Sequence, residues 1–433
     1  MTLTHIVRGI LGIAILLAIA YAFSYHKKKI SWKLVVTGIL LQVVFAVLVL
    51  KVPFVREAFS FFGSLFTKIL AYQREGAKFV FGDLAIQDKV GFIFATQILP
   101  TIIFFSALMS ALYYLGILQK IVYGIAWVIS KSMKLSGAES LAAASNIFLG
   151  QTEAPLLIKP FVPKMTLSEL LTVMTAGMAT IAGGVMASFI ALLGGDNPAQ
   201  QQLFATHLLS ASVMAAPGAI VFSKIILPQT EPEKIDNKLV LTKETIGGNI
   251  IEAISMGTLD GLKLAANVGA MLIAFIAVIF MLNSILSGIG EMIPIGSGSL
   301  NKWIEIQTDG HFKKLDLQLI FGLIFQPIAW VIGVEWQDTM IVGRLLGEKT
   351  VINEYVGYIS LSQLKGQISE RSTIIATYAL CGFSNFASIG IQIGGIGAIA
   401  PEQRANLAKL GLSALLGGSL SCFMTACIAG MLL

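Results

Sequence analysis

Three groups of polar side chains interrupt the apolar segments of this 433-residue chain, and they are its best candidates for chemistry. The first group is Gln151, Thr152 and Glu153, at a turn between two short apolar arms. If these apolar segments cross a membrane, an ionisable side chain within them costs about 2.5–3.5 kcal/mol of insertion free energy. Such a side chain is therefore retained where it has a function. We favour a substrate contact for Glu153; the alternative is that it only caps a half-helix through backbone N–H groups.

The second group, Glu335 and Asp338, flanks another turn between short apolar arms. Either carboxylate could instead cap a helix at the membrane interface, and we favour Asp338 as the site residue. The third group is Asn385 and Ser388, which share one face if their segment is helical. Phe383 lies beside them, where a lone Phe is more often a core residue.

Together these groups suit a neutral, hydrogen-bonding solute. Carboxylates accept hydrogen bonds from hydroxyls, amides match a heteroaromatic edge, and an aromatic ring offers a face for stacking. Neither turn has a cluster of Arg or Lys beside it, which disfavours an anionic solute such as a nucleotide.

The composition indicates which kind of protein must position these groups. Hydrophobic residues make up 56 % of the chain and charged residues 12 %, about half the share in soluble domains. The formal charge of +6 comes from Lys and Arg between apolar runs, which we interpret as topology and headgroup contacts, not as a nucleic-acid surface. Cys381, Cys422 and Cys427 lack CxxC spacing, so no zinc site or disulfide framework is indicated. The sequence therefore predicts an all-α integral membrane protein in a lipid bilayer.

About eight membrane-spanning helices fit the apolar runs, because each span needs roughly 20 residues. Lys27, Lys28 and Lys29 follow the first run, whereas a signal peptide carries its positive charge in front; the N-terminus is therefore expected outside the cell. A mixed stretch to about residue 90 is assigned to interfacial helices. The expected spans are 9–23, 34–50, 92–115, 167–194, 206–227, 262–287, 373–400 and 406–432.

The two halves of the chain repeat one pattern, a hairpin of short arms followed by a broken helix. Re-entrant hairpins are expected at 141–160 and 318–346, and polar interruptions fall within 167–194 and 373–400. Such pairs are typical of inverted-repeat transporters, with the binding site at the breaks. The expected parts are N-terminal scaffold spans and interfacial helices (1–130), transport core repeat 1 (131–227), a hydrophilic linker (228–261), a scaffold span with an outer loop (262–316) and transport core repeat 2 (317–433).

Motifs of soluble enzymes give little support to another class of function. Residues 395–400 fit a dinucleotide fingerprint by letter, but they end a membrane helix with no strand before it. Glu348 breaks a near match to a phosphate-binding loop, and HExxH and GxSxG are absent.

Four motifs, in order along the chain, closely resemble those of the concentrative nucleoside transporter family. They are NIFLGQTEAPLLIKPFVP from Asn146 to Pro163, NVGAMLIAF from Asn267 to Phe275, Gly347-Glu348-Lys349 with Asn353-Glu354-Tyr355, and CGFSN from Cys381 to Asn385. The resemblance runs from the first span to the end of the chain. It implies a homotrimer in which a unit with both hairpins moves against a scaffold.

The resemblance also implies roles for particular residues. Those expected at the nucleobase are Gln151, Thr152 and Glu153, with Val185 and Phe383 packing nearby; those expected at the ribose are Asn385, Ser388 and Asp338. The implied sodium ligands are the side chains of Asn146 and Thr180 and the carbonyls of Leu149 and Ile181. Three positions depart from the pattern expected for the family. Asp338 stands where Glu is expected, Glu335 where Pro is expected, and Tyr355 where Phe is usual. The ribose geometry and the substrate range therefore stay open.

The sequence thus predicts a cation-coupled symporter that imports nucleosides by alternating access through a cell membrane, with a bacterial inner membrane expected. By this resemblance, sodium is the expected coupling cation. A proton-coupled nucleoside carrier and a membrane-embedded enzyme are the alternatives. The sequence does not separate purine from pyrimidine nucleosides.

Overall fold

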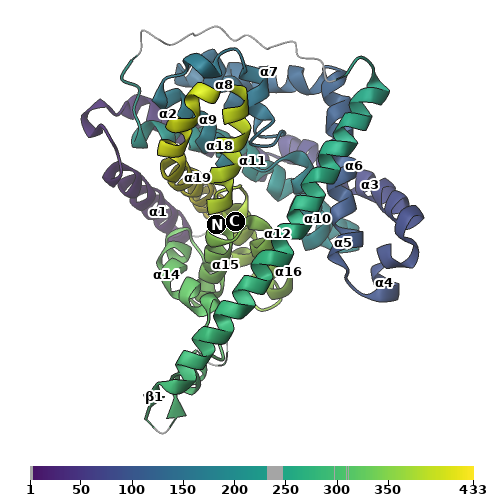
Figure 1. Cartoon of the computed structure of the whole chain (residues 1–433). Coiled ribbons are helices and arrows are strands. Elements are labelled where there is room, and N and C mark those ends of the chain that lie inside the picture. The colour runs from purple at the N-terminus through teal and green to yellow at the C-terminus, as the bar shows by residue number, and fades with distance from the viewer. Residues whose placement is uncertain (1–2, 232–246, 297, 309, 311) are drawn as a thin grey trace.

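The structure is a computed structural model that describes residues 3–231, 247–296, 298–308, 310 and 312–433 (Figure 1). It is almost entirely helical, with one antiparallel ribbon of two short strands, β1 (Pro294–Ile295) and β2 (Gly298–Ser299). In chain order, the helices are α1 (Leu3–Ala22), α2 (Trp32–Lys51), α3 (Pro53–Phe81), α4 (Gln87–Val90), α5 (Phe94–Gln97), α6 (Leu99–Tyr114), α7 (Ile117–Met133), α8 (Gly137–Ser145), α9 (Leu167–Ala179), α10 (Gly183–Gly194), α11 (Pro198–Ile226), α12 (Ile250–Met292), α13 (Leu300–Gln307), α14 (Leu317–Val331), α15 (Thr339–Val351), α16 (Glu354–Leu364), α17 (Glu370–Leu380), α18 (Phe386–Ile399) and α19 (Arg404–Leu432).

Seven helical segments in the described part of the chain are long and apolar enough to cross a membrane, judged by length and composition. The eighth expected span, 373–400, is divided between α17 and α18, each too short to cross alone. The expected multi-pass helical architecture is confirmed. The little β-ribbon was not expected.

The first repeat begins with a hairpin whose entering arm is α8. A capping box closes the start of α8, because Ser136 Oγ accepts from the Glu139 N–H (3.1 Å) and Glu139 Oε2 accepts from the Ser136 N–H (3.4 Å). The returning arm consists of 3₁₀ turns at Ala154–Ile158 and Val162–Lys164 instead of a regular helix. The following helix breaks between α9 and α10, where Thr180 and Ala182 have extended backbone.

The second repeat has the same order of elements. The arms α14 and α15 pack against each other and meet at a turn that contains a 3₁₀ segment, Trp336–Asp338. The broken helix is α17 and α18, interrupted between Cys381 and Asn385. An additional helix, α16, lies between this hairpin and the broken helix, and the sequence pattern did not predict it separately.

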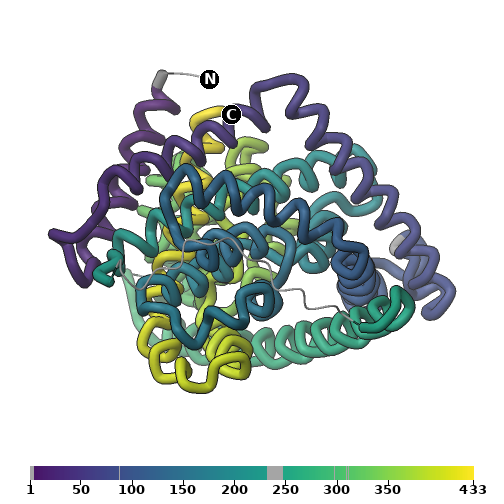
Figure 2. The backbone as a smooth tube through the Cα atoms, turned by 90° about the horizontal axis from the view of Figure 1, so that it is seen from above, coloured from purple at the N-terminus to yellow at the C-terminus, as the bar shows by residue number. Residues whose placement is uncertain are grey.

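The inner and outer helices of the bundle differ in burial. Helices α11 and α19 contact each other, and both also contact α9. The most apolar stretch of each of these two helices is almost fully buried. Helix α12 packs mainly on α6 and leaves most of its apolar surface exposed. Seen from above, α12 lies along one edge and α3 along another, outside the hairpins and broken helices (Figure 2). This arrangement is that of a packed core with scaffold helices around it.

Helix α12 is longer than the sequence indicated. It has 43 residues, about 65 Å at 1.5 Å per residue, and begins at Ile250, not at 262. The expected linker at 228–261 is therefore shorter at its end, and its residues 232–246 lie outside the described part. The start of α1 lies beside the end of α19, since a Cβ at Gly9 would meet the Met431 side chain. The two ends of the bundle therefore lie close together (Figure 1).

Candidate functional site

The two broken helices meet at their interruptions. The N–H of Phe383 donates to the carbonyl oxygen of Thr180 (3.3 Å), which links the second break to the first. Asn385 begins α18 as its N-cap, and its Oδ1 accepts from the N–H of Ser388 (2.9 Å). Backbone groups that the helix ends leave without intrahelical partners are thus satisfied here, and polar side chains from both repeats come together.

The tip of the first hairpin joins this region through buried amides. Gln151 Nε2 donates to Ser388 Oγ (3.1 Å), and Gln151 Oε1 accepts from Gln392 Nε2 (3.0 Å). Gln392 Nε2 also donates to the Met174 carbonyl of α9 (3.0 Å). This packing requires a glycine in α9, because a Cβ at Gly177 would lie 2.8 Å from Gln392 Nε2.

A buried carboxylate that we did not assign from the sequence completes the cluster. Asn385 Nδ2 donates to Glu354 Oε2 (2.7 Å), and Glu354 is the first residue of α16, where free N–H groups favour negative charge. The buried Lys349 donates to the Ala379 carbonyl at the end of α17 (2.9 Å) and interacts electrostatically with Glu354. We refer to Gln151, Glu354, Asn385, Ser388 and Gln392 as the polar cluster.

Two members of the polar cluster were missed, although the sequence contained a signal for each. Glu354 stands in the Asn353-Glu354-Tyr355 motif, which carried the resemblance but was given no role. Gln392 is four residues after Ser388 in α18, so the two share a helix face.

Glu153 and Val185 line a cavity of about 320 Å³ next to the first hairpin. Its polar walls also include Ser106 and Ser110 of α6 and Asp260 of α12, so the scaffold closes one side. Glu153 Oε2 accepts from the Gly150 N–H (3.0 Å), which closes the turn. The Glu153 carboxylate thus bonds back to its own turn instead of capping the 3₁₀ turn that follows it, and the residue also lines a cavity of ligand size.

Three other expected or unusual residues lie close to the cluster. Thr152 packs on α18, where a Cβ at Gly395 would lie 2.4 Å from its Cγ2. Phe383 is buried in the main hydrophobic core. The hydroxyl of Tyr355 lies 3.0 Å from that of Ser188, so the Tyr that replaces a usual Phe has a hydrogen-bond partner.

Asp338 does not join the polar cluster. Its Oδ2 accepts from the N–H (3.1 Å) and Oγ (2.9 Å) of Ser369, the N-cap of α17. Helix α17 has 11 residues, about 16 Å, and its other end leads to Asn385. Asp338 thus ties the second hairpin to the far end of α17. This placement does not support the expected ribose contact, because the carboxylate bonded to Asn385 is Glu354.

The expected cation ligands belong to the first hairpin and the first break, which are joined where the Gly183 N–H donates to the Phe148 carbonyl oxygen (2.9 Å). Asn146 ends α8, its Nδ2 donates to the Ala142 carbonyl (2.8 Å), and its buried Oδ1 has no hydrogen-bond partner. Thr180 Oγ1 donates to the Ala176 carbonyl (2.9 Å) and keeps lone pairs free. No described hydrogen bond ends on the carbonyls of Leu149 or Ile181. An unpartnered buried oxygen beside irregular backbone fits a hard cation such as Na⁺.

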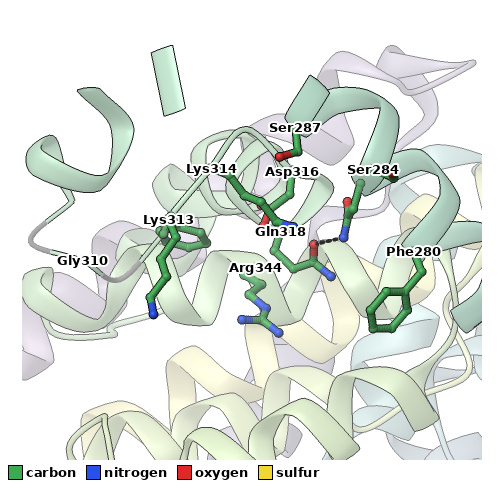
Figure 3. A pocket seen from close by; sticks show the side chains of 11 residues that line it. Phe280, Ser284, Ser287, Gly310, Lys313, Lys314, Asp316, Gln318 and Arg344 are labelled. Atoms are coloured by element: carbon green, nitrogen blue, oxygen red, sulfur yellow. Dashed lines mark hydrogen bonds between the residues drawn. The ribbon is translucent and has the colours of Figure 1, made fainter. Parts of the chain in front are cut away.

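A separate cavity of about 560 Å³ lies between α12 and the second hairpin (Figure 3). Its charged walls are Lys313, Lys314, Asp316 and Arg344, and Arg344 Nε is bonded to Glu348 Oε1 at 2.8 Å. None of the expected site residues lines it, so we place the candidate site at the polar cluster and its neighbouring cavity.

Paired hairpins, broken helices and a buried polar cluster between them define a multi-pass membrane transporter. Residues 11–84 match the family described as "Na+ dependent nucleoside transporter N-terminus", residues 207–430 match its C-terminal counterpart, and residues 95–196 match "Nucleoside recognition". The chain belongs to the concentrative nucleoside transporter family.

Individual relatives agree with this assignment over nearly the whole chain. An uncharacterized transporter of Haemophilus influenzae is 42 % identical over 98 % of this chain and 97 % of its own length. Sodium/nucleoside cotransporter 2 of Rattus norvegicus is 41 % identical over 97 % of this chain, which covers 62 % of the rat protein. The solved structure of CNTnw in an inward-facing substrate-bound state is 37 % identical, with a TM-score of 0.86 over 99 % of this chain and 98 % of CNTnw.

Proposed function

We propose that this protein is a sodium-coupled symporter that imports nucleosides by alternating access. The observation that carries the proposal is the buried polar cluster where the tip of the first hairpin meets the second repeat, together with the unpartnered Asn146 oxygen in the same hairpin. Such a junction can bind a polar solute and a cation together. Relatives named sodium/nucleoside cotransporters, and related structures in inward-facing and outward-facing states, support this function.

The substrate would lie between the two repeats. Asn385, Ser388 and Glu354 would bind the ribose hydroxyls, because a carboxylate and an amide accept and donate hydrogen bonds to a vicinal diol. Gln151, Thr152 and Glu153 would contact the nucleobase, and Val185 and Phe383 would pack beside it. Glu354 replaces Asp338 in this assignment because it bonds Asn385 directly.

The cation would be held by Asn146 and Thr180 with the carbonyls of Leu149 and Ile181. A proton-coupled carrier is the second candidate, and the position of Glu153 on a cavity wall favours it, because a carboxylate there could take up a proton. We give sodium preference because the Asn146 oxygen lacks a partner.

Uptake of labelled uridine into proteoliposomes, with sodium and pH gradients imposed separately, tests the proposal. Accumulation should follow the sodium gradient at equal pH on both sides. Accumulation driven by pH alone, and indifferent to sodium, would establish the proton-coupled alternative. Chemical analysis of the internal label tests the enzyme alternative, since a carrier returns its substrate unchanged. Cross-linking in membranes would test the proposed homotrimer.

A further inference from the structure

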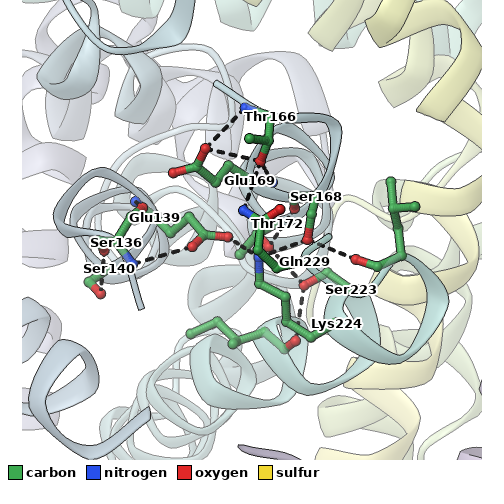
Figure 4. Close-up of polar contacts among 12 residues, drawn as sticks. Ser136, Glu139, Ser140, Thr166, Ser168, Glu169, Thr172, Ser223, Lys224 and Gln229 are labelled. Atoms are coloured by element: carbon green, nitrogen blue, oxygen red, sulfur yellow. Dashed lines mark hydrogen bonds and ion pairs between the residues drawn. The ribbon is translucent and has the colours of Figure 1, made fainter. Parts of the chain in front are cut away.

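A second group of buried polar side chains lies at the opposite end of the helices that carry the proposed cation ligands (Figure 4). Lys224 of α11 forms an ion pair with Glu139 of α8, and both side chains are almost fully buried. Lys224 Nζ also donates to Ser168 Oγ in α9 (2.9 Å). One ammonium group therefore ties three helices together.

The same residues also form the helix starts. Glu139 uses Oε2 for the capping box of α8 and Oε1 for Lys224. Ser168 lies in the first turn of α9 and donates to the Leu227 carbonyl just after α11 (2.8 Å). Thr166 and Glu169 form a capping box of their own at the start of α9. The starts of α8 and α9 are thus fixed to each other through α11.

Both helices end at the proposed cation site. Asn146 is the residue after α8, which has nine residues, about 14 Å. Thr180 is the residue after α9, which has 13 residues, about 20 Å. Each helix is a short rigid rod, so a tilt or slide at the tied end changes the spacing between the Asn146 and Thr180 oxygens. A cation site needs its oxygens at set distances.

We propose that the tie between Glu139, Lys224 and Ser168 is a positioning device that sets the sodium affinity of the site at the far ends of α8 and α9. The inference rests on the proposed sodium coupling. In this proposal, Glu139 and Lys224 do not contact the sodium ion. Their effect passes through the relative placement of two helices.

The double variant E139Q/K224M separates this role from simple stability. Gln retains the capping box and Met retains the apolar stem of Lys, so both charges leave together and no buried charge stays unpaired. The matched control is E169Q, the same change at the equivalent position of α9, where the described side-chain bonds stay within the cap. A second variant, S168A, cuts the link to α9 and keeps the ion pair.

The readout is thermal unfolding of the purified protein titrated with NaCl, at an ionic strength kept constant with choline chloride and without nucleoside. We expect E139Q/K224M to need about tenfold more sodium than the parent protein to reach half of the sodium-dependent stabilisation. S168A should need a few-fold more sodium than the parent, and E169Q should need the same concentration as the parent. Uridine binding at saturating sodium should be unchanged in all three.

A parental sodium curve for E139Q/K224M would overturn the inference; if that variant does not fold, a parental curve for S168A would do so. No sodium response in the parent protein would instead overturn the proposed sodium coupling itself.

Discussion

The side-chain amide of Asn385 donates a 2.7 Å hydrogen bond to the carboxylate of Glu354, which is 31 residues earlier in the chain and on another helix. Asn385 begins α18 and Glu354 begins α16, so this bond joins two helix starts. The dipoles of the two helix N-termini contribute positive potential around one carboxylate. In the proposed function, this pair would bind the ribose hydroxyls.

Replacing Glu354 by Gln should weaken nucleoside binding strongly. Charge-assisted hydrogen bonds contribute about 1.5–3 kcal/mol each, so one lost bond corresponds to about tenfold to a hundredfold in affinity. A nucleoside analogue that lacks a ribose hydroxyl should lose less against the variant than uridine does. The measurement is equilibrium binding to purified protein.

Asp338→Asn is the matched control for that substitution. Its carboxylate bonds only to Ser369 among the described contacts, at the far end of α17. We expect uridine affinity within about threefold of the parent and a loss of about 1 kcal/mol in stability, the usual net value of a hydrogen bond. If Asp338→Asn weakens uridine as much as Glu354→Gln does, the assignment of the ribose carboxylate to Glu354 is wrong.

Glu153→Gln should abolish nucleoside accumulation in a protein that still folds. Gln retains an oxygen to accept from the Gly150 N–H, so the turn is preserved while the charge on the cavity wall is lost. The control is Asp260→Asn, a carboxylate of α12 that lines the same cavity and lies 3.9 Å from Lys263. Uptake by Asp260→Asn should stay near the parental level. Equal uptake by both variants at matched expression would contradict a substrate role for Glu153.

Gly177→Ala should disturb the nucleobase side of the site. The new Cβ would lie 2.8 Å from Gln392 Nε2 and 3.0 Å from Gln151 Cβ, so these side chains must shift away from α9. We expect uridine affinity to fall by about tenfold, the value of one hydrogen bond that is lost or distorted. Gly394→Ala in α18 is the control, because no atom lies within 4 Å of its added Cβ. An unchanged affinity for Gly177→Ala would show that Gln151 does not contact the base.

Asn146→Ala should raise the sodium concentration for half-maximal uptake by tenfold or more. The variant removes the one buried side-chain oxygen of the proposed site that has no partner in the structure. Ala is a good helix former, so the end of α8 should persist. Sodium dependence of uptake, measured at saturating uridine, is the test; a parental sodium curve would remove Asn146 from the site.

The sequence by itself determined the class of protein and the location of its breaks. Low charge and long apolar runs leave a membrane bundle as the only stable solution, since backbone groups in lipid must be satisfied within helices. Polar residues at 151–153 and 385–388 are costly there, and the structure places Gln151, Asn385 and Ser388 in one buried cluster. These signals are local, so a pattern in one segment was sufficient to detect them.

Only the tertiary structure showed which carboxylate forms a hydrogen bond with Asn385. Glu354 and Asp338 are both acidic residues near the second hairpin, and no local pattern distinguishes a carboxylate at a cluster from one at a helix cap. Their roles depend on which end of α17 each approaches, and that depends on how α15, α16 and α17 pack. The ion pair between Glu139 and Lys224 could not be predicted from the sequence for the same reason. The two residues are 85 positions apart in the chain, and only tertiary packing brings them into contact.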